Sequence, residues 1–348
     1  MSVFVSIRQH ATPIAVERGQ TILEAALARG VPYPHGCRSG NCGACKSRLE
    51  AGEVELAPYS EYALTEAERA EGLVLACRAV PWSDVAIAWL EADEVAAHPL
   101  RQLTCRVVAI ADATHDIKRL HLATEDGGPF AFSAGQYAAL TFAGHRPRDY
   151  SMANTPEEPV LEFHIRRTAE GAASNYVADR LRLGERVELD GPYGSSWLRE
   201  GHRGPILAIA GGSGLAPIKS IVATALTRGM AQSIALYFGV RDERDLYLEA
   251  FFRALEARHR NFRFVPVLSD PAGETARRRG FVHEAALADH PDLDGTKAYL
   301  AGPPAMVEAA TASLLARGLR RQDIHADAFY SEAEKAALAA TAALERIA

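Results

Sequence analysis

The sequence predicts a multidomain chain in three parts: a mixed strand-and-helix domain around a cysteine cluster, an antiparallel β-barrel, and an α/β domain with a doubly wound parallel sheet. Three observations lead to this prediction. Three cysteines fall within nine positions of HGCRSGNCGACKSRL, residues 35–49. Short, partly alternating runs separated by Gly, Pro and Asp clusters occupy the middle of the chain. Apolar strand-like runs then alternate with helical stretches in the last third.

The length and composition agree with this organisation. A chain of 348 residues exceeds one ordinary core, and 48% hydrophobic with 24% charged residues is typical of a globular protein in water. The net charge of −6 gives no reason to expect nucleic acid or an anionic membrane as partner. The N-terminus lacks the pattern of a signal peptide, and no apolar run reaches the roughly 18 residues of a membrane span. Five cysteines in such a chain indicate reduced thiols and a cytoplasmic location.

The cysteine cluster predicts a metal site. Cys37, Cys42 and Cys45 are spaced C-x4-C-x2-C, and Cys77 follows after 31 intervening residues, which is the plant-type [2Fe–2S] spacing. The small residues between them let backbone N–H groups turn inward and offset the negative charge of such a cluster. A zinc site is the alternative, but it usually pairs C-x2-C with a second such pair or with histidines. A redox C-x-x-C would leave Cys37 and Cys77 without a role. We therefore predict one [2Fe–2S] cluster with four cysteine ligands.

The segments around the cluster predict the fold of the first domain. Two strand-like runs, Val3–Ile7 and Thr12–Val16, precede a helix that begins at Thr21, where Glu24 completes a capping box. The cysteine loop follows directly. This order of strand, strand, helix and cluster loop resembles the β-grasp fold of plant-type ferredoxins, over about residues 1–93.

The second domain is predicted over residues 104–200, after a linker at 94–103. Its short strands are CRVVAIAD, IKRLHLAT, QYAALTF, PVLEFHIR and RVELDGPYG, a pattern typical of an antiparallel barrel. Cys105 lies outside the cluster spacing, so we expect it to be a buried core thiol. Residues 191–195, GPYGS, have the composition of a turn.

The segment RPRDYSMAN predicts a flavin site within this domain. Arg148, Tyr150 and Ser151 fit R-x-Y-S and precede HIRR and GAASNYV, which resembles the FAD site of the ferredoxin–NADP reductase superfamily. An arginine there neutralises the flavin pyrophosphate, a tyrosine offers a π face to the isoalloxazine, and a serine hydroxyl bonds near flavin N5. We assign Tyr150 and Ser151 to the catalytic site on this basis.

The resemblance also implies a second phosphate-binding turn, from Gly171 to Ser174. Here we expect Ser174 to be the N-cap of the helix SNYVADRL, a position that also suits an anion. Arg166 has two open interpretations: a second contact to the pyrophosphate, or a solvated strand residue.

The third domain is predicted over residues 201–330, with a glycine turn between a strand and a helix in GPILAIAGGSGLAPIKSIVATAL. The Rossmann fingerprint fails twice, because a proline replaces its third glycine and an arginine follows the next strand in place of an acidic residue. G-G-x-G-x-A-P is instead similar to the nicotinamide-domain signature of the same superfamily. The expected NAD(P)-binding residues here are Gly211, Gly212, Gly214, Pro217 and Arg241.

The last motifs lie near the C-terminus. YLAGPP ends a predicted strand, so Gly302 and Pro303 are expected to bind NAD(P), with Ala301 where the superfamily commonly has a cysteine. Phe329 occupies the place of the superfamily's C-terminal aromatic near the flavin, which makes it a catalytic-site candidate, although a core aromatic would look the same. Residues 331–348 favour a helix, for which we predict no role.

Taken together, the three parts resemble the reductase components of bacterial aromatic-ring oxygenases, of the naphthalene and nitrotoluene dioxygenase type. The resemblance implies a ferredoxin–NAD(P)⁺ reductase in which FAD accepts hydride from NADH, or alternatively NADPH, and feeds single electrons to the cluster. The implied acceptor is a Rieske-type ferredoxin or terminal oxygenase, and we expect a monomer. The same core serving a diiron monooxygenase or a deoxysugar dehydratase is the alternative. A non-enzymatic regulator built on a decayed reductase is a third possibility.

Overall fold

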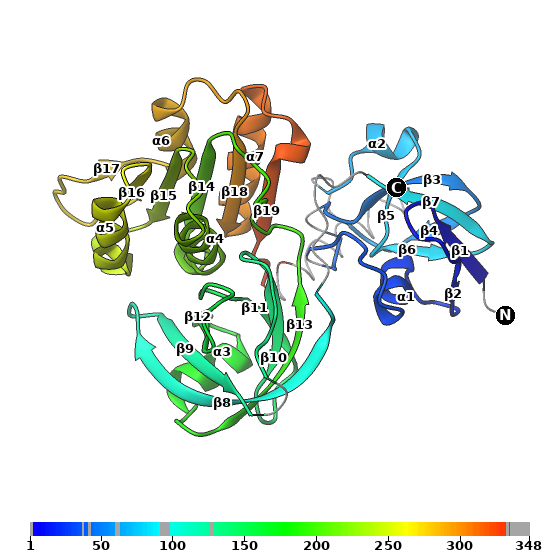
Figure 1. The fold of residues 1–348 in the computed structure, drawn as a ribbon, viewed down its shortest axis with the longest axis horizontal. Coiled ribbons are helices and arrows are strands. Elements are labelled where there is room, and N and C mark those ends of the chain that lie inside the picture. The colour runs from blue at the N-terminus through cyan, green and yellow to red at the C-terminus, as the bar shows by residue number, and fades with distance from the viewer. Residues whose placement is uncertain are drawn as a thin grey trace. The chain divides into compact units, whose positions relative to one another are not determined.

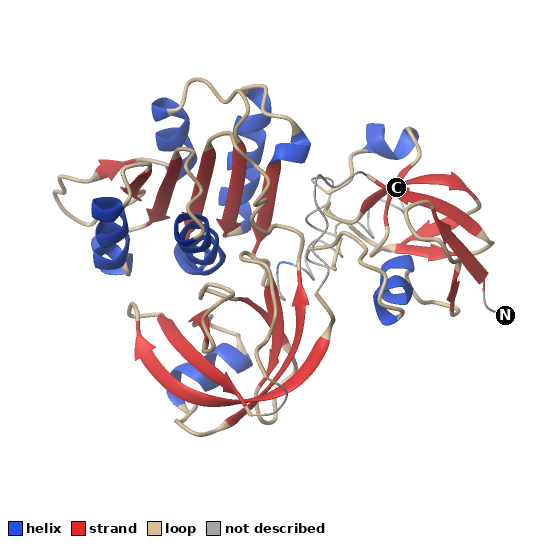
Figure 2. Ribbon diagram, viewed as in Figure 1, coloured by secondary structure: helices blue, strands red, loops and turns tan. Residues whose placement is uncertain are grey.

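Three large sheets organise the chain, one in each predicted part (Figures 1 and 2). The structure is a computed structural model that describes residues 3–36, 38–40, 43–59, 63–90, 98–125, 128–331 and 334. The chain divides into two units, of which the second is His98–Phe329. No helix in the described ranges has both the length and the apolar character needed to cross a bilayer.

The first unit contains a five-stranded mixed sheet with the order β2-β1-β7-β3-β5, beside a separate β4–β6 pair. β1 runs parallel to β7 and antiparallel to β2, and helix α1 packs its apolar residues on the sheet core. The predicted capping box of Thr21 and Glu24 is present, and the β-grasp prediction is confirmed. The elements are β1 Val3–Ile7, β2 Ile14–Val16, α1 Ile22–Ala28, β3 Lys46–Ala51, β4 Val54–Leu56, α2 Glu66–Ala70, β5 Leu73–Leu75, β6 Ala79–Pro81 and β7 Val85–Trp89.

The second unit begins with a six-stranded antiparallel sheet, ordered β11-β10-β13-β8-β9-β12. A bridge between Met152 and Phe163 joins its two ends, which closes the predicted barrel. The elements are β8 Arg101–Asp112, β9 Ile117–Thr124, β10 Tyr137–Thr141, β11 Arg148–Ser151, β12 Leu161–Arg166, α3 Ala172–Asp179 and β13 Arg186–Tyr193.

Three sequence-based expectations are tested in the barrel. Cys105 is fully buried in its core, as predicted, and burial raises the pKa of this thiol to about 12. The turn predicted at 191–195 is wrong for its first residues, because β13 continues to Tyr193, which pairs with Tyr137. Strand β8 begins at Arg101, inside the predicted linker, since Arg101 already pairs with Gly191.

The remainder of this unit is a doubly wound parallel sheet, ordered β17-β16-β15-β14-β18-β19. Helices α4 and α5 cover one face and α6 and α7 the other. The elements are β14 Ile206–Gly211, η1 Gly212–Gly214, α4 Leu215–Thr227, β15 Ile234–Val240, η2 Glu243–Asp245, α5 Glu249–Arg258, β16 Phe262–Leu268, β17 Arg278–Arg279, α6 Val282–Asp289, β18 Lys297–Gly302, α7 Pro304–Ala316, η3 Arg321–Asp323 and β19 Ile324–Ala328.

Helix α4 joins the barrel to the parallel sheet (Figure 1). Ile117 and Ala134 of the barrel belong to the same buried apolar cluster as Leu215, Ile218 and Ile221 of α4. Because this cluster is continuous, moving either domain relative to the other exposes apolar surface. The barrel and the parallel-sheet domain therefore pack together as one unit.

Two glycines let strands β14 and β18 approach at their carboxyl ends. A Cβ on Gly214 would lie 2.1 Å from the carbonyl oxygen of Ala301. Gly302 has φ +145°, and a Cβ there would lie 2.8 Å from the carbonyl oxygen of Gly211. Neither position has room for a side chain, so this edge of the sheet depends on both glycines.

We predict that Gly214→Ala lowers the free energy of unfolding by about 2 kcal/mol or more, because the added methyl group overlaps backbone of β18. NADH-dependent turnover should fall with it, since the glycine turn is displaced. Thermal denaturation and steady-state kinetics measure the two effects. Gly273→Ala is the matched control, because an added Cβ there meets nothing within 4 Å. Equal behaviour of the two variants would contradict the packing argument.

Candidate functional site

Two of the four predicted cluster ligands lie in the described residues. Cys45 and Cys77 are both buried, at 3% and 4% exposure, although 31 residues separate them in the chain. The backbone N–H of Cys77 donates to Cys45 Sγ over 3.5 Å. Cys37 and Cys42 lie outside the described residues. The structure thus brings Cys45 and Cys77 together, with an inward amide of the kind a cluster needs.

The glycines of the cysteine loop fit an iron–sulfur cluster. Gly40 and Gly43 have φ of +80° and +72°. A Cβ on Gly40 would lie 2.9 Å from the side chains of Tyr59 and Arg78, and one on Gly43 would lie 3.0 Å from the carbonyl oxygen of Ala63. A loop that excludes side chains in this way can direct its backbone amides at a bound anionic group.

The predicted flavin residues Arg148, Tyr150 and Ser151 lie together on β11, which pairs with β10. Burial raises the pKa of Tyr150 to about 12, so its phenol stays neutral and can donate a hydrogen bond. Ser151 is buried, and its hydroxyl lies 3.4 Å from Oδ2 of Asp327 on β19. Sequence reasoning missed Asp327, although it stands only two residues before the predicted aromatic, Phe329.

The predicted phosphate turn exists, but Ser174 is not its N-cap. Helix α3 begins at Ala172, with Gly171 as N-cap and no side-chain cap bond. Ser174 lies inside the first turn, where its hydroxyl donates to the carbonyl of Gly171 and accepts from the backbone N–H of Thr168. The prediction failed because the chain turns earlier, at Thr168–Gly171. No side chain caps the amides at the start of α3, which is compatible with an anion there.

The predicted nicotinamide residues gather at the carboxyl ends of β14 and β18. Gly211 and Gly302 touch there, and the N–H of Phe329 donates to the carbonyl of Gly302 over 2.9 Å. Helices α4 and α7, which begin at this edge, have no side-chain cap bond, whereas α1 and α2 each have a complete capping box. Pro217 lies in the first turn of α4, and Ala301 is fully buried. The uncapped helix starts fit a dinucleotide with its phosphates.

Arg166, whose role was open, and Arg241 lie at this edge too. Arg166 Nε donates to Asp116 over 2.7 Å, and a Cβ on Gly212 would lie 3.3 Å from Arg166 Nη1. The barrel thus presents Arg166 to the glycine turn of the α/β domain. Arg241 is exposed directly after β15, and the N–H of Asp270 donates to its carbonyl.

Comparisons with known proteins agree with this geometry. Three family models match in the predicted order: a 2Fe-2S iron-sulfur cluster binding domain at 6–82, an oxidoreductase FAD-binding domain at 104–197 and an oxidoreductase NAD-binding domain at 208–312. A ferredoxin–NAD(P)⁺ reductase component of naphthalene 1,2-dioxygenase/salicylate 5-hydroxylase systems from a Ralstonia species is 43% identical, covering 90% of this chain and 94% of that protein. The chain belongs to this family of oxygenase-system reductases.

Two further relatives extend the comparison. The reductase component of phenol 2-monooxygenase from Pseudomonas sp. strain CF600 is 40% identical and covers 99% of both chains. The crystal structure of an Amycolatopsis cytochrome P450 reductase matches with a TM-score of 0.79 at 41% identity, over 94% of this chain and 98% of that one. The predicted cofactor set is confirmed at the level of domains: the reductase has [2Fe–2S]-, FAD- and NAD-binding domains and transfers electrons from NAD(P)H.

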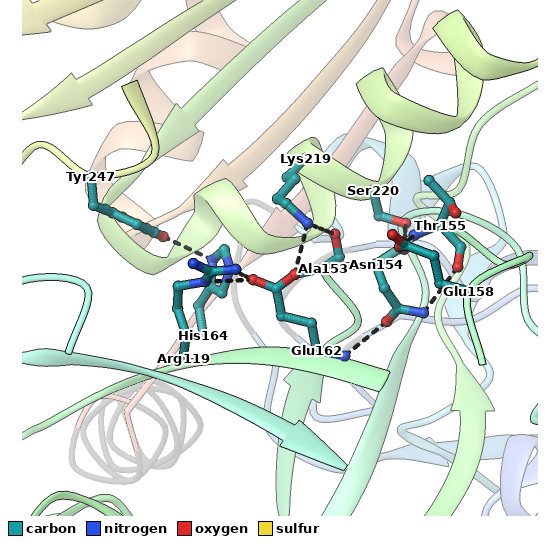
Figure 3. Close-up of polar contacts among 10 residues, drawn as sticks. All are labelled: Arg119, Ala153, Asn154, Thr155, Glu158, Glu162, His164, Lys219, Ser220 and Tyr247. Carbon is teal, nitrogen blue, oxygen red and sulfur yellow. Dashed lines mark hydrogen bonds and ion pairs between the residues drawn. The ribbon is translucent and has the colours of Figure 1, made fainter. Parts of the chain in front are cut away.

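Sequence reasoning also missed a buried polar network between the barrel and helix α4 of the reductase (Figure 3). Its centre is Glu162 on β12, which accepts hydrogen bonds from Arg119 Nε at 2.7 Å and Lys219 Nζ at 2.7 Å. His164 Nε2 lies 3.0 Å from the same carboxylate, and His164 Nδ1 lies 2.9 Å from the hydroxyl of Tyr247. We call these five residues the Glu162 network. A usable signal was Lys219, the one charged residue of helix α4.

The charges of the Glu162 network are mutually stabilised. Burial opposes ionisation of Glu162, but His164 and Lys219 outweigh it and hold the pKa of this carboxyl well below its usual range. Burial lowers the pKa of His164, Lys219 and Arg119 lower it further, and Glu162 opposes them. At neutral pH we therefore assign an ionised Glu162 and a neutral His164.

This assignment predicts a pH effect on stability. A folded-state pKa below the usual 6.5 means that the unfolded chain binds a proton at His164 more readily, so the stabilisation is present above pH 6.5 and is lost as the pH falls below it. We expect the difference in melting temperature between the wild type and His164→Gln to shrink between pH 7.5 and about 5. The other histidines cancel in this difference. A difference that stays constant with pH would show that the pKa of His164 is the same in both states, and one that grows as the pH falls would show a charged imidazole in the folded protein.

Proposed function

We propose that the reductase binds NADH at the carboxyl ends of β14 and β18, beside an FAD held by β11 and α3, and delivers the electrons to an oxygenase component. The observation that carries this proposal is the bond from the Phe329 N–H to the Gly302 carbonyl, with Ser151 and Asp327 alongside. It joins the predicted flavin contacts to the predicted nicotinamide loop. A hydride donor and acceptor must meet at one such place.

Each predicted residue has a proposed role. Arg148 and the amides of Gly171 to Ser174 would bind the flavin pyrophosphate, while Tyr150, Ser151 and Phe329 would contact the isoalloxazine. The NAD(P) phosphates would lie on the glycine turn with Arg166, and Gly302 with Pro303 would border the nicotinamide. The four cysteines would hold the cluster. Bound FAD and [2Fe–2S] supply the conversion of a two-electron donor into single electrons.

We further propose that the domains run over 1–93, 104–200 and 201–330, with strand β8 extending the second domain back to Arg101, and that the protein acts as a cytoplasmic monomer. The uneven cysteine count supports the cytoplasmic location. Of the tail at 331–348, only Ser331 and Glu334 are described, so its helix remains a prediction.

The acceptor is proposed to be a Rieske-type ferredoxin or terminal oxygenase. The Ralstonia relative, named for a dioxygenase and hydroxylase system, supports this choice. A monooxygenase as acceptor is the second candidate, because the phenol 2-monooxygenase reductase matches 99% of both chains. Turnover of the purified reductase with a Rieske ferredoxin and with a phenol monooxygenase, at equal concentrations, decides between them. Failure of NADH to bleach the flavin would overturn the whole proposal.

The cluster assignment predicts a selective loss in Cys77→Ala. Iron and acid-labile sulfide should fall to background, because one of four ligands is removed. Electron transfer from NADH to a dye that accepts from the flavin should stay within about twofold, since the barrel and α/β domain form a separate unit. Cys105→Ala is the control, because Cys105 is buried in the barrel. Iron content that survives in Cys77→Ala would rule out this ligand.

Arg241 predicts the nicotinamide preference. Asp242 follows Arg241 in the chain, and the backbone N–H of Asp270 donates to the Arg241 carbonyl. Carboxylates in this region disfavour the 2′-phosphate of NADPH, so we expect the reductase to prefer NADH. Arg241→Ala should lower kcat/KM for NADPH about tenfold and leave that for NADH within about twofold, because a charged hydrogen bond to phosphate is lost. Equal losses for both nucleotides would place Arg241 along the adenosine instead.

A further inference from the structure

The Glu162 network connects the two proposed cofactor sites through helix α4 (Figure 3). Lys219 Nζ donates to the carbonyl of Ala153 at 2.9 Å, and Ser220 Oγ donates to that of Asn154 at 2.7 Å. These two carbonyls follow Ser151, at the end of the flavin strand, by two and three residues. Helix α4 itself begins at Leu215, directly after the glycine turn. A single turn of α4 thus ties the segment after Ser151 to the phosphate-binding turn.

A second connection reaches the glycine turn itself. The Tyr247 hydroxyl lies 2.9 Å from His164 Nδ1 and 3.2 Å from the carbonyl of Gly212. Because Glu162 is ionised and His164 neutral, the imidazole proton lies on Nε2 and is donated to Glu162. The single proton of the Tyr247 hydroxyl then lies between two acceptors, His164 Nδ1 and the carbonyl oxygen of Gly212. Glu162 therefore fixes the orientation of His164, which holds Tyr247 against the turn.

We propose that Glu162 and Lys219 are positioning residues that set the distance and angle between the nicotinamide and the flavin. The inference rests on the proposed function, in which Ser151 contacts flavin and the glycine turn holds the dinucleotide. The barrel is thus connected at two places, the segment after Ser151 and strand β12, to the glycine turn and the helix that follows it, which restricts rotation as well as translation. Hydride transfer is sensitive to both, since displacements of about 1 Å can cost as much as 100-fold in rate. Neither residue touches the reacting atoms.

The test removes the network in two ways. Lys219→Met and Glu162→Gln each leave a buried partner uncompensated, so each should lower the melting temperature. The double variant, Lys219→Met with Glu162→Gln, removes both charges of the pair. Arg119 keeps its charge but is partly exposed and therefore remains solvated. The melting temperature of this double variant should recover, whereas its limiting rate of flavin reduction by NADH should stay about 10- to 100-fold low, because no amine reaches the Ala153 carbonyl. The dissociation constant of NADH should change by less than about threefold, since the phosphate contacts remain.

A matched control lies inside the α/β domain. Lys297 Nζ donates to buried Asp323 over 3.0 Å, and Asp323 also accepts from Arg320, as Glu162 does from Arg119. The double variant Lys297→Met with Asp323→Asn should reduce flavin at the wild-type rate, whether or not its melting temperature changes. Amide hydrogen exchange over 212–220 provides a readout independent of turnover, and it should accelerate only in the Glu162 and Lys219 variants.

The outcomes separate the two levels of inference. A double variant that melts like the wild type and reduces flavin at the wild-type rate overturns the positioning role while the proposed function stands. A wild type whose flavin NADH does not reduce overturns the proposed function, and the positioning role with it. A rate that falls equally in the control pair shows a general loss of rigidity, and this result also contradicts the proposal.

Discussion

The buried carboxylate of Glu162 constrains how the electron-input half of the reductase is built. An ion of this kind is tolerated away from water only with several donors, and here β9, β12 and α4 each supply one. Removing one partner of such a buried ion pair typically lowers the free energy of unfolding by about 3–5 kcal/mol. An apolar contact of similar size has no preferred direction and allows small displacements. The apolar cluster shared by the barrel and α4 holds the two close together but does not fix the angle between them. The hydrogen bonds of the Glu162 carboxylate are directional and therefore restrict that angle.

The same constraint explains where the sites lie. Glycines at the carboxyl ends of β14 and β18 let the backbones of these two strands come into contact. The helices that begin there, α4 and α7, have no side-chain cap bond. Anions bind at such places, but the sites are useful for hydride transfer only if the flavin strand keeps a constant distance from them. Lys219 and Ser220 donate to the segment after β11, and in our proposal these bonds supply that distance.

The sequence predicted what short segments encode and missed what tertiary contacts create. Cysteine spacing, R-x-Y-S and the glycine turn each carry their chemistry within a few residues, and the order of three such motifs predicted three domains. Glu162 and Lys219 are 57 residues apart, and Ser151 and Asp327 are 176 apart, so only folding brings them together. The error at Ser174 has a local cause: several residues in that turn are acceptable caps, and packing of Thr168 selects Gly171.

The first unit carries the cluster-binding domain and the second carries the FAD- and NAD-binding domains, and this separation is relevant to which acceptor protein the reductase serves. Relatives at 43% and 40% identity are named for a dioxygenase/hydroxylase system and for a monooxygenase, so the family keeps its electron-input chemistry while its acceptors differ. Buried contacts such as the Glu162 network, for which we propose a positioning role, leave little room for substitution without loss of stability. Acceptor preference must then depend on exposed residues of the cluster-binding unit, where substitution changes docking and leaves the fold intact. Trp82 and Phe4, at 61% and 52% exposure, are large aromatic side chains on the surface of this unit, where a substitution leaves its core unchanged.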